Sequence, residues 1–261
     1  MKHTLFLLAG LILTLTSCTK VIELDLNNAP KQVVIEGIVT DQPGPYTVRV
    51  SQSSGFYESG IGEVVPNATV TISDGVGVPE SLTYAGSGNY QTRALRGVPG
   101  RTYTLNVTVG AQRFVATSVM PQPVPLDKLS TEALPIGDSK AVFAHFTDPA
   151  NTKNFYRWVL TVNDRKQNDV YVMDDRLMDG RTTRQALRAN NPTAQTIKSG
   201  DRVTVEMQGL DARLYDYFKG LAQVIGTEDS ATPANPTSNL SGGALGYFSA
   251  CSASKVQIMV P

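Results

Sequence analysis

Alternation of apolar and polar side chains is the feature that most restricts the fold of this chain. Three stretches show it between residues 33 and 119, at 46–51, 68–73 and 103–109. In each stretch the apolar positions are Val, Ile, Leu, Tyr or Ala, and the positions between them are Thr, Ser, Asn or Arg. Since successive side chains of a strand point to opposite faces, this pattern predicts strands with one face in a core and the other in water.

Turn residues separate these strands at regular intervals. Gly, Pro, Asp and Asn gather at 41–45, 73–75, 86–89 and 98–100. About seven short strands at this spacing predict an antiparallel β-sandwich over residues 32–122. No helical periodicity interrupts them, which argues against parallel βαβ units. Residues 66–75, 88–90 and 99–105 resemble a carboxypeptidase-regulatory or transthyretin-like module, so we expect an immunoglobulin or transthyretin-like sandwich.

A proline-rich stretch, Met120-Pro121-Gln122-Pro123-Val124-Pro125, is the best candidate for a domain boundary. Its prolines keep the chain extended and remove donors from any strand ladder. We therefore place a second domain at residues 123–261. Further strands are predicted there, at 141–146, 156–162, 169–173, 202–207 and 255–260.

One stretch of the second domain has helical periodicity, at residues 212–225. Its apolar residues recur at intervals of three and four, which is typical of a helix lying on a core. They are Leu214, Tyr217, Phe218, Leu221, Val224 and Ile225. Asp211 is suited to cap the first turn and Gly226 to end the helix. Packing on a sheet explains this stripe better than a partner-binding helix. The expected fold is mainly β, a sandwich followed by a β-rich domain with one α-helix.

The first 17 residues have the plan of a secretory signal. Lys2 and His3 precede a short apolar run at 5–15, which is too short to span a membrane. The run ends in Leu15-Thr16-Ser17-Cys18, which resembles a bacterial lipobox. That resemblance implies cleavage before Cys18 and attachment of diacylglycerol to its sulfur. Two or more acyl chains hold a protein stably on a membrane. Residues 18–31 would then be a lipidated tether, and the alternative is an ordinary signal peptide with a chance cysteine.

Cysteine and histidine are scarce, with two of each in the chain. If the signal is removed and Cys18 is lipidated, only Cys251 and His145 remain. This excludes an internal disulfide and zinc sites with several His or Cys ligands. We predict that Cys251 is a small buried hydrophobe rather than a reactive thiol. We predict that His145 is a solvated or hydrogen-bonded strand residue rather than the base of a Ser-His-Asp arrangement. No metal and no cofactor are expected.

Charge is balanced, with 23 basic and 23 acidic residues, so no global field attracts nucleic acid. Arg181, Arg184 and Arg188 lack an aromatic platform and are interpreted as a solvated face rather than a nucleic-acid site. Asp174, Asp175 and Asp179 are oxygen donors of the kind that calcium prefers. Their spacing does not match an EF-hand, and Arg176 and Arg181 would neutralise them. A charged turn is therefore preferred over a calcium site.

A longer loop at residues 53–66 contains Phe56, Tyr57 and Ile61. Aromatic and aliphatic side chains on an exposed loop would form a contact patch for a partner. The same side chains could instead fold back over the sandwich. These three residues are the candidate contact loop of the protein.

Several segments, taken in order, resemble the Bacteroidota lipoprotein family known as domain-of-unknown-function family 4249. They are residues 19–26 behind the lipobox, 34–37, Asp148-Pro149 with 154–157, 174–180, and Asn235-Pro236 leading to 245–248. The resemblance covers nearly the whole mature chain and supplies no catalytic residues. It implies an outer-membrane lipoprotein, often encoded near a TonB-dependent transporter.

We therefore expect a non-enzymatic binding or accessory subunit, anchored in the outer membrane through Cys18, at the cell surface or on the periplasmic face. Its implied role is nutrient uptake or envelope assembly, with a TonB-dependent transporter as partner and no nucleic acid. One alternative is a surface hydrolase of glycans or peptides, which would need paired carboxylates such as Asp148, Asp174, Asp175 and Glu206. Another is a purely structural envelope protein.

Overall fold

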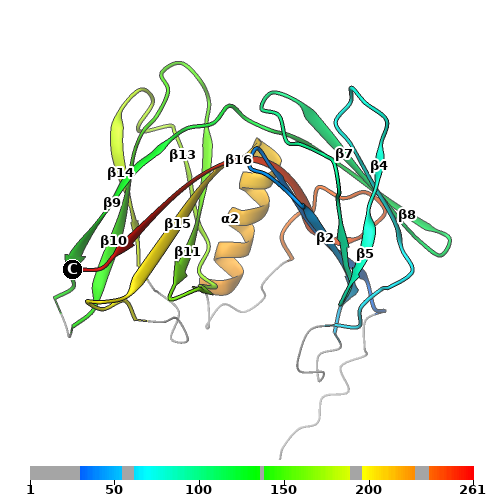
Figure 1. The fold of residues 1–261 in the computed structure, drawn as a ribbon, viewed down its shortest axis with the longest axis horizontal. Helices are drawn as coiled ribbons and strands as arrows, with labels where there is room; N and C mark the ends of the chain where they lie inside the picture. The colour runs from blue at the N-terminus through cyan, green and yellow to red at the C-terminus, as the bar shows by residue number, and fades with distance from the viewer. Residues whose placement is uncertain (1–29, 55–61, 136–137, 189–195, 227–234) are drawn as a thin grey trace, which may run out of the picture.

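The structure is a computed structural model that describes residues 30–54, 62–135, 138–188, 196–226 and 235–261. Within these ranges the fold is mainly β with the single helix α2 (Ala212–Gly226), which confirms the predicted fold class. Figure 1 shows two β-rich units side by side, with α2 between them. One long strand, β16 (Leu245–Met259), passes from one unit to the other.

The first unit is a sandwich of eight strands and the first half of β16. The strands are β1 (Val33–Thr40), β2 (Thr47–Gln52), β3 (Thr69–Ser73), β4 (Glu80–Ser81), β5 (Thr83–Gly86), β6 (Asn89–Gln91), β7 (Thr102–Val109) and β8 (Gln112–Val119). One layer has the order β4-β3-β7-β8, and the other contains β16-β1-β2-β6-β5. The alternating apolar side chains of β2, β3 and β7 point into the core between the layers, as predicted.

The second unit packs a three-stranded sheet, β14-β10-β9, against the other end of the large sheet. Its strands are β9 (Leu126–Ala133), β10 (Lys140–Thr147), β11 (Phe155–Val162), β12 (Arg165–Lys166), β13 (Tyr171–Asp174), β14 (Thr182–Leu187) and β15 (Arg202–Gly209). An aromatic cluster fills its core. Phe146 lies 5.0 Å from Tyr156 and 5.7 Å from Trp158 between ring centroids.

Strand β16 belongs to both units. Residues 245–251 pair in parallel with β1, and residues 252–259 pair antiparallel with β15. The predicted strand at 255–260 is therefore the end of a much longer strand. The pairing with β1 is parallel and so departs from the expected antiparallel sandwich. A parallel pair requires a long crossover connection, and here all the elements from β2 to α2 lie between the two strands. Gly246, with φ +91°, is needed here because a Cβ atom would lie 2.1 Å from the Ile35 carbonyl oxygen.

Helix α2 packs on the face of the large sheet that is opposite to both cores. Leu214 and Phe218 are buried there with Tyr247 and Cys251. The helix begins and ends within one residue of the predicted bounds. Asp211 caps it as predicted, since its Oδ1 accepts the Leu214 N–H at 3.0 Å. The apolar stripe is best buried in the first turns, and Ile225 near the end is 37% exposed.

Residues on both sides of the proline-rich stretch at 120–125 contribute to the first core. Leu240, Ala244, Phe248 and Ala250 are buried in it, although they follow the second unit in the sequence. A chain that ended at the proposed boundary would therefore lack part of this core. The two cores are spatially separate, but the sequence that builds the first one is discontinuous.

Candidate functional site

An open pocket, called the junction pocket below, lies between β8 of the first unit and α2. It has a volume of about 640 Å³. Its walls are residues 115–117 of β8, Arg213 and Asp216 of α2, and the segment 237–241 that leads into β16. This volume falls within the range of about 300–1,000 Å³ that small-molecule sites occupy.

The segment 237–241 closes the gap between the outer edges of β8 and β16. The Asn239 amide imitates a strand, because its Oδ1 accepts the Phe248 N–H at 3.0 Å and its Nδ2 donates to the Phe248 carbonyl at 2.8 Å. Nδ2 also lies 3.3 Å from the Thr117 carbonyl oxygen. On the β8 side, Ser241 N–H donates to the Val115 carbonyl at 2.8 Å, and Val115 N–H donates to Ser241 Oγ at 3.0 Å. One wall of the pocket is thus fixed by hydrogen bonds.

The helical wall is fixed by the N-terminal cap of α2. The second carboxylate oxygen of Asp211 accepts the Ser118 hydroxyl at 2.6 Å and the Val119 N–H at 3.2 Å. Ser118 Oγ in turn accepts the Ala250 N–H at 2.9 Å. One carboxylate therefore ties the helix to β8, and one hydroxyl ties β8 to β16. The sequence predicted Asp211 as a cap but gave no sign of these two further contacts.

A buried arginine also holds α2 in place. The Arg157 guanidinium carbon lies 3.9 Å from the centroid of the Phe218 ring, and its Nη1 donates to Gln208 Oε1 at 3.2 Å. Arg157 is only 7% exposed. Burial of a cation is costly unless polar and aromatic groups surround it. This contact joins α2 to β11 of the large sheet.

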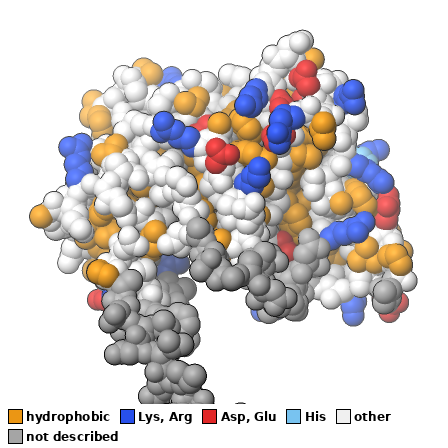
Figure 2. Space-filling view, turned by 180° about the vertical axis from the view of Figure 1, so that it is seen from behind, with side chains coloured by type: hydrophobic (Ala, Val, Ile, Leu, Met, Phe, Trp, Pro, Cys, Tyr) orange, Lys and Arg blue, Asp and Glu red, His pale blue; other side chains and the backbone are white. Residues whose placement is uncertain are grey.

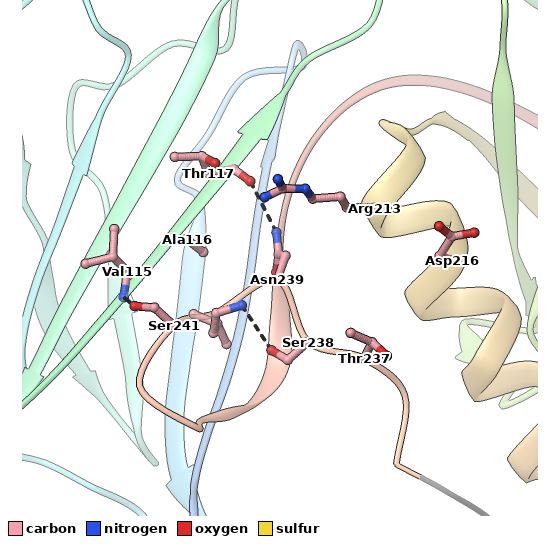
Figure 3. Close-up of a pocket in the computed structure, with 10 residues that line it drawn as sticks. Val115, Ala116, Thr117, Arg213, Asp216, Thr237, Ser238, Asn239 and Ser241 are labelled. Carbon is pink, nitrogen blue, oxygen red and sulfur yellow. Dashed lines mark hydrogen bonds between the residues drawn. The ribbon is translucent and has the colours of Figure 1, made fainter.

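The polar lining of the pocket falls into two groups. One group already makes the hydrogen bonds that hold the segment 237–241 in place; its members are Ser238, Asn239 and Ser241. A second, exposed group makes no side-chain hydrogen bond or ion pair within the described ranges; its members are Thr117, Arg213, Asp216 and Thr237. Figure 3 shows Arg213 reaching from α2 toward Thr117, with Asp216 further along the same helix. The second group offers one cation, one anion and two hydroxyls to a ligand.

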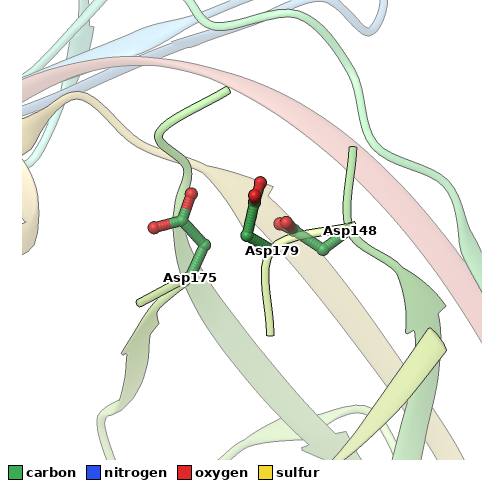
Figure 4. Close-up of side chains that lie close together, drawn as sticks. All are labelled: Asp148, Asp175 and Asp179. Atoms are coloured by element: carbon green, nitrogen blue, oxygen red, sulfur yellow. The ribbon is translucent and has the colours of Figure 1, made fainter. Parts of the chain in front are cut away.

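Three carboxylates meet at the end of the second unit (Figure 4). The oxygens of Asp148, Asp175 and Asp179 lie within 4.8 Å of one another, and Asp148 and Asp175 are buried. Each accepts a main-chain N–H from the opposite loop. Gly180 donates to Asp148 at 3.3 Å, Asn154 to Asp175 at 2.6 Å, and Asn151 to Asp179 at 2.8 Å. The cluster therefore clasps the β10–β11 loop to the β13–β14 loop.

These contacts bear on the two chemical roles considered for the aspartates, a calcium site and the paired carboxylates of a hydrolase. Asp148 also accepts the Tyr156 hydroxyl, and this bond, together with burial, raises the pKa of Tyr156. Asp174 lies apart from the cluster and pairs with Arg176 at 2.9 Å, which holds the pKa of Asp174 below its usual value. Glu206 is on β15 and pairs with Lys255 at 3.2 Å. Of the carboxylates proposed for a hydrolase, the structure brings only Asp148 and Asp175 together, and both hold loops.

His145 and Cys251 occupy the environments that the sequence predicts. His145 lies on β10 and its Nε2 is 2.7 Å from Ser130 Oγ. Burial, with Lys128 and Arg184 nearby, lowers the pKa of His145. Cys251 is fully buried, and burial raises the pKa of its thiol to about 12. A thiol with this pKa is protonated and inert at neutral pH.

Other predicted sites fall outside the described residues. These are the lipidation site Cys18 and the candidate contact loop, Phe56, Tyr57 and Ile61. Sequence reasoning missed Arg213 and Asp216. Their signal was a pair of opposite charges three residues apart, directly after a helix cap. Thr117 and Thr237 gave no signal, since only the fold brings them to the helix.

Most of the charged side chains on the face seen in Figure 2 lie toward its right-hand side. Basic and acidic side chains occur there together, among hydrophobic ones. In the described parts of the chain, no helix combines the length and apolar character needed to cross a membrane.

The fold and this pocket define a class: a β-sandwich protein of two units that share one strand, with an open pocket beside the helix between them. The family described as Domain of unknown function (DUF4249) matches residues 19–257, and the chain belongs to it. The matched range includes both units, α2 and every residue of the pocket. A comparison with curated proteins finds no match.

Proposed function

We propose that this protein is a non-enzymatic binding or accessory lipoprotein of the outer membrane, held by lipid on Cys18. Its partner in this proposal is a TonB-dependent transporter, and its role is nutrient uptake or envelope assembly. The observation that supports a binding role most directly is the junction pocket. It combines walls fixed by hydrogen bonds with exposed side chains that have no partner within the described ranges. Sites with such pre-formed walls lose little entropy when a ligand binds.

The position of the first described residue, Pro30, supports the proposal of a body held on a tether. The N-terminal end of the described residues, at Pro30, leads into β1 at one end of the first unit. Eleven residues lie between Cys18 and Pro30, and a fully extended chain over this interval would reach about 40 Å. A body on such a tether can meet a neighbouring membrane protein without leaving the membrane.

The anchor is tested by membrane fractionation. Cys18→Ser should release the body into the soluble fraction, because no acyl chain remains to hold it. Cys251→Ala is the matched control, since Cys251 is buried and free, and it should stay in the membrane pellet. Retention of the Cys18→Ser protein in the pellet would refute the lipid anchor.

The partner is tested by crosslinking in native membranes, followed by extraction of the lipidated protein in mild detergent. The expected result is that a TonB-dependent transporter is recovered with it by mass spectrometry. The Cys18→Ser protein should recover less of it, because the tether raises the local concentration of the two proteins. Recovery of the lipoprotein without a transporter after crosslinking would overturn the accessory role.

A further inference from the structure

We infer that the junction pocket binds a short peptide with free ends, a di- or tripeptide, through Arg213 and Asp216. This inference deepens the proposed binding role and rests on it. The two side chains supply one positive and one negative charge to the same open space. A free peptide is a zwitterion, with a carboxylate for the guanidinium and an ammonium for the carboxylate.

The spacing of the two charges sets the size of the ligand. Residues three apart on a helix have Cβ atoms about 5–6 Å apart on one face. The Arg213 side chain extends from α2 toward Thr117, on the side away from Asp216 (Figure 3). Extended residues span about 3.3–3.6 Å each, so the ends of a di- or tripeptide are separated by about 7–10 Å. A free amino acid has ends too close to reach both groups fully.

The remaining groups of the pocket suit a peptide backbone. The hydroxyls of Thr117 and Thr237 each donate and accept, so they can bond either the N–H or the C=O of an amide. The apolar part of the lining consists of Val115, Ala116 and Leu240. The pocket volume of about 640 Å³ leaves room for varied side chains.

Other ligand classes fit the lining less well. Sugar sites commonly stack rings on aromatic side chains, and none of the residues that line this pocket is aromatic. A phosphate-rich ligand would meet a single cation with a carboxylate beside it. A lipid tail would leave the exposed charges of Arg213 and Asp216 without partners. The lining therefore favours a ligand with one charge of each sign.

The test uses the full lipidated chain in mild detergent and isothermal titration with trialanine. Matched peptides are trialanine amide, which lacks the carboxylate, and acetyl-trialanine, which lacks the ammonium. Trialanine should bind at least about tenfold more tightly than either, as expected for one charge-assisted hydrogen-bonded pair. Arg213→Gln should weaken trialanine binding to the level of its amide and abolish the difference between these two. Asp216→Asn should do the same for the acetylated peptide.

The control variant is Lys219→Gln, an exposed change on the same helix outside the pocket, which should leave all three affinities unchanged. Absence of trialanine binding up to about 10 mM would overturn the peptide assignment, as would equal affinity for the three peptides. Competition by maltotriose that depends on Arg213 would assign the pocket to sugars instead. Recovery of a transporter in the crosslinking experiment does not depend on any of these peptides, so the accessory role can survive failure of this inference.

Discussion

The two units show different ways of holding their end loops, although both are sandwiches built on the same sheet. In the first unit, each of two carboxylates acts by itself. Glu80 accepts the N–H groups of Arg93, Ala94 and Leu95, and Asp74 accepts those of Val76 and Gly77. In the second unit, Asp148, Asp175 and Asp179 act across two loops, and Asp148 and Asp175 are buried. Loss of Glu80 or Asp74 should release only the main-chain groups that this one carboxylate binds. Loss of a member of the cluster should loosen both of the loops that the cluster joins.

The two cores also differ in the side chains that fill them. The first core is mainly aliphatic and takes residues from both ends of the chain, while the second is organised around Phe146, Tyr156 and Trp158. Among the described strands, only β16 is common to both units. The cores are therefore separate in space and joined by one strand. Deletion of β16 and truncation of Phe248 should reveal how strongly that strand couples them, and changes at Asp148 and Glu80 should reveal how the end loops are held.

The largest effect should come from deleting residues 245–261. This removes the partner of β1 in the first unit and the partner of β15 in the second, along with Phe248 and Ala250 of the first core. We expect loss of cooperative thermal unfolding and of near-ultraviolet circular dichroism in both units. Deleting only residue 261, which lies beyond the strand, is the control. Its carbonyl accepts the side chains of Lys140 and Ser199 at the surface, so this deletion should lower the melting temperature far less than the larger one. A cooperative melt in the larger deletion would show that one unit folds without β16.

Phe248→Ala should destabilise the protein by about 3–5 kcal/mol, because it empties a fully buried site in the first core. Trp158, the single tryptophan, lies in the second core and reports on that unit alone by its fluorescence. If β16 couples the units, the urea transition seen by Trp158 fluorescence will shift to lower concentration. A Phe114→Ala variant, in the same first core but on β8, is the matched comparison. An unshifted fluorescence transition in Phe248→Ala would mean that the units unfold independently.

Asp148→Ala should cost about 2–3 kcal/mol, because it leaves the buried Tyr156 hydroxyl and the Gly180 N–H without their acceptor. Asp148→Asn should cost less, since an amide oxygen can still accept and the repulsion among three carboxylates falls. Chemical denaturation followed by circular dichroism measures both. Asp164→Asn, at an exposed ion pair with Arg202, is the control and should change stability by less than about 1 kcal/mol. Equal, small effects for both Asp148 variants would argue against a clasp.

Glu80→Gln should have the smallest effect, about 1–2 kcal/mol at neutral pH, and should remove part of the acid sensitivity of the first unit. Burial opposes ionisation of Glu80, but three main-chain N–H groups hold its pKa below the usual 4.5. A lowered folded pKa gives stability that is present above the unfolded pKa and lost as the pH falls through the folded value. Melting temperatures between pH 7 and 3 should therefore fall less in Glu80→Gln than in the wild type. Parallel curves for the two proteins would contradict this role of Glu80.

Much of the local structure could be predicted because it depends on neighbours in the sequence. Alternation at 46–51, 68–73 and 103–109 identified β2, β3 and β7, and the apolar stripe with Asp211 identified α2 and its cap. Cys251 in a buried site and His145 on a strand followed from the same patterns. These features reflect side-chain periodicity and local hydrogen bonding, which act over a few residues.

Tertiary structure alone decided the features that give this protein its candidate site. The sequence predicted a strand at 255–260, but not that it continues back to Leu245 as one strand shared by two units. It showed acidic residues at 174–179. It did not show that Asp148 joins Asp175 and Asp179 in one cluster, or that Asp174 pairs with Arg176 instead. It gave no hint that Thr117, Arg213 and Thr237 would surround one pocket. Such contacts depend on which distant edges pair and in what register, and register is selected by the total burial and hydrogen bonding of the folded chain.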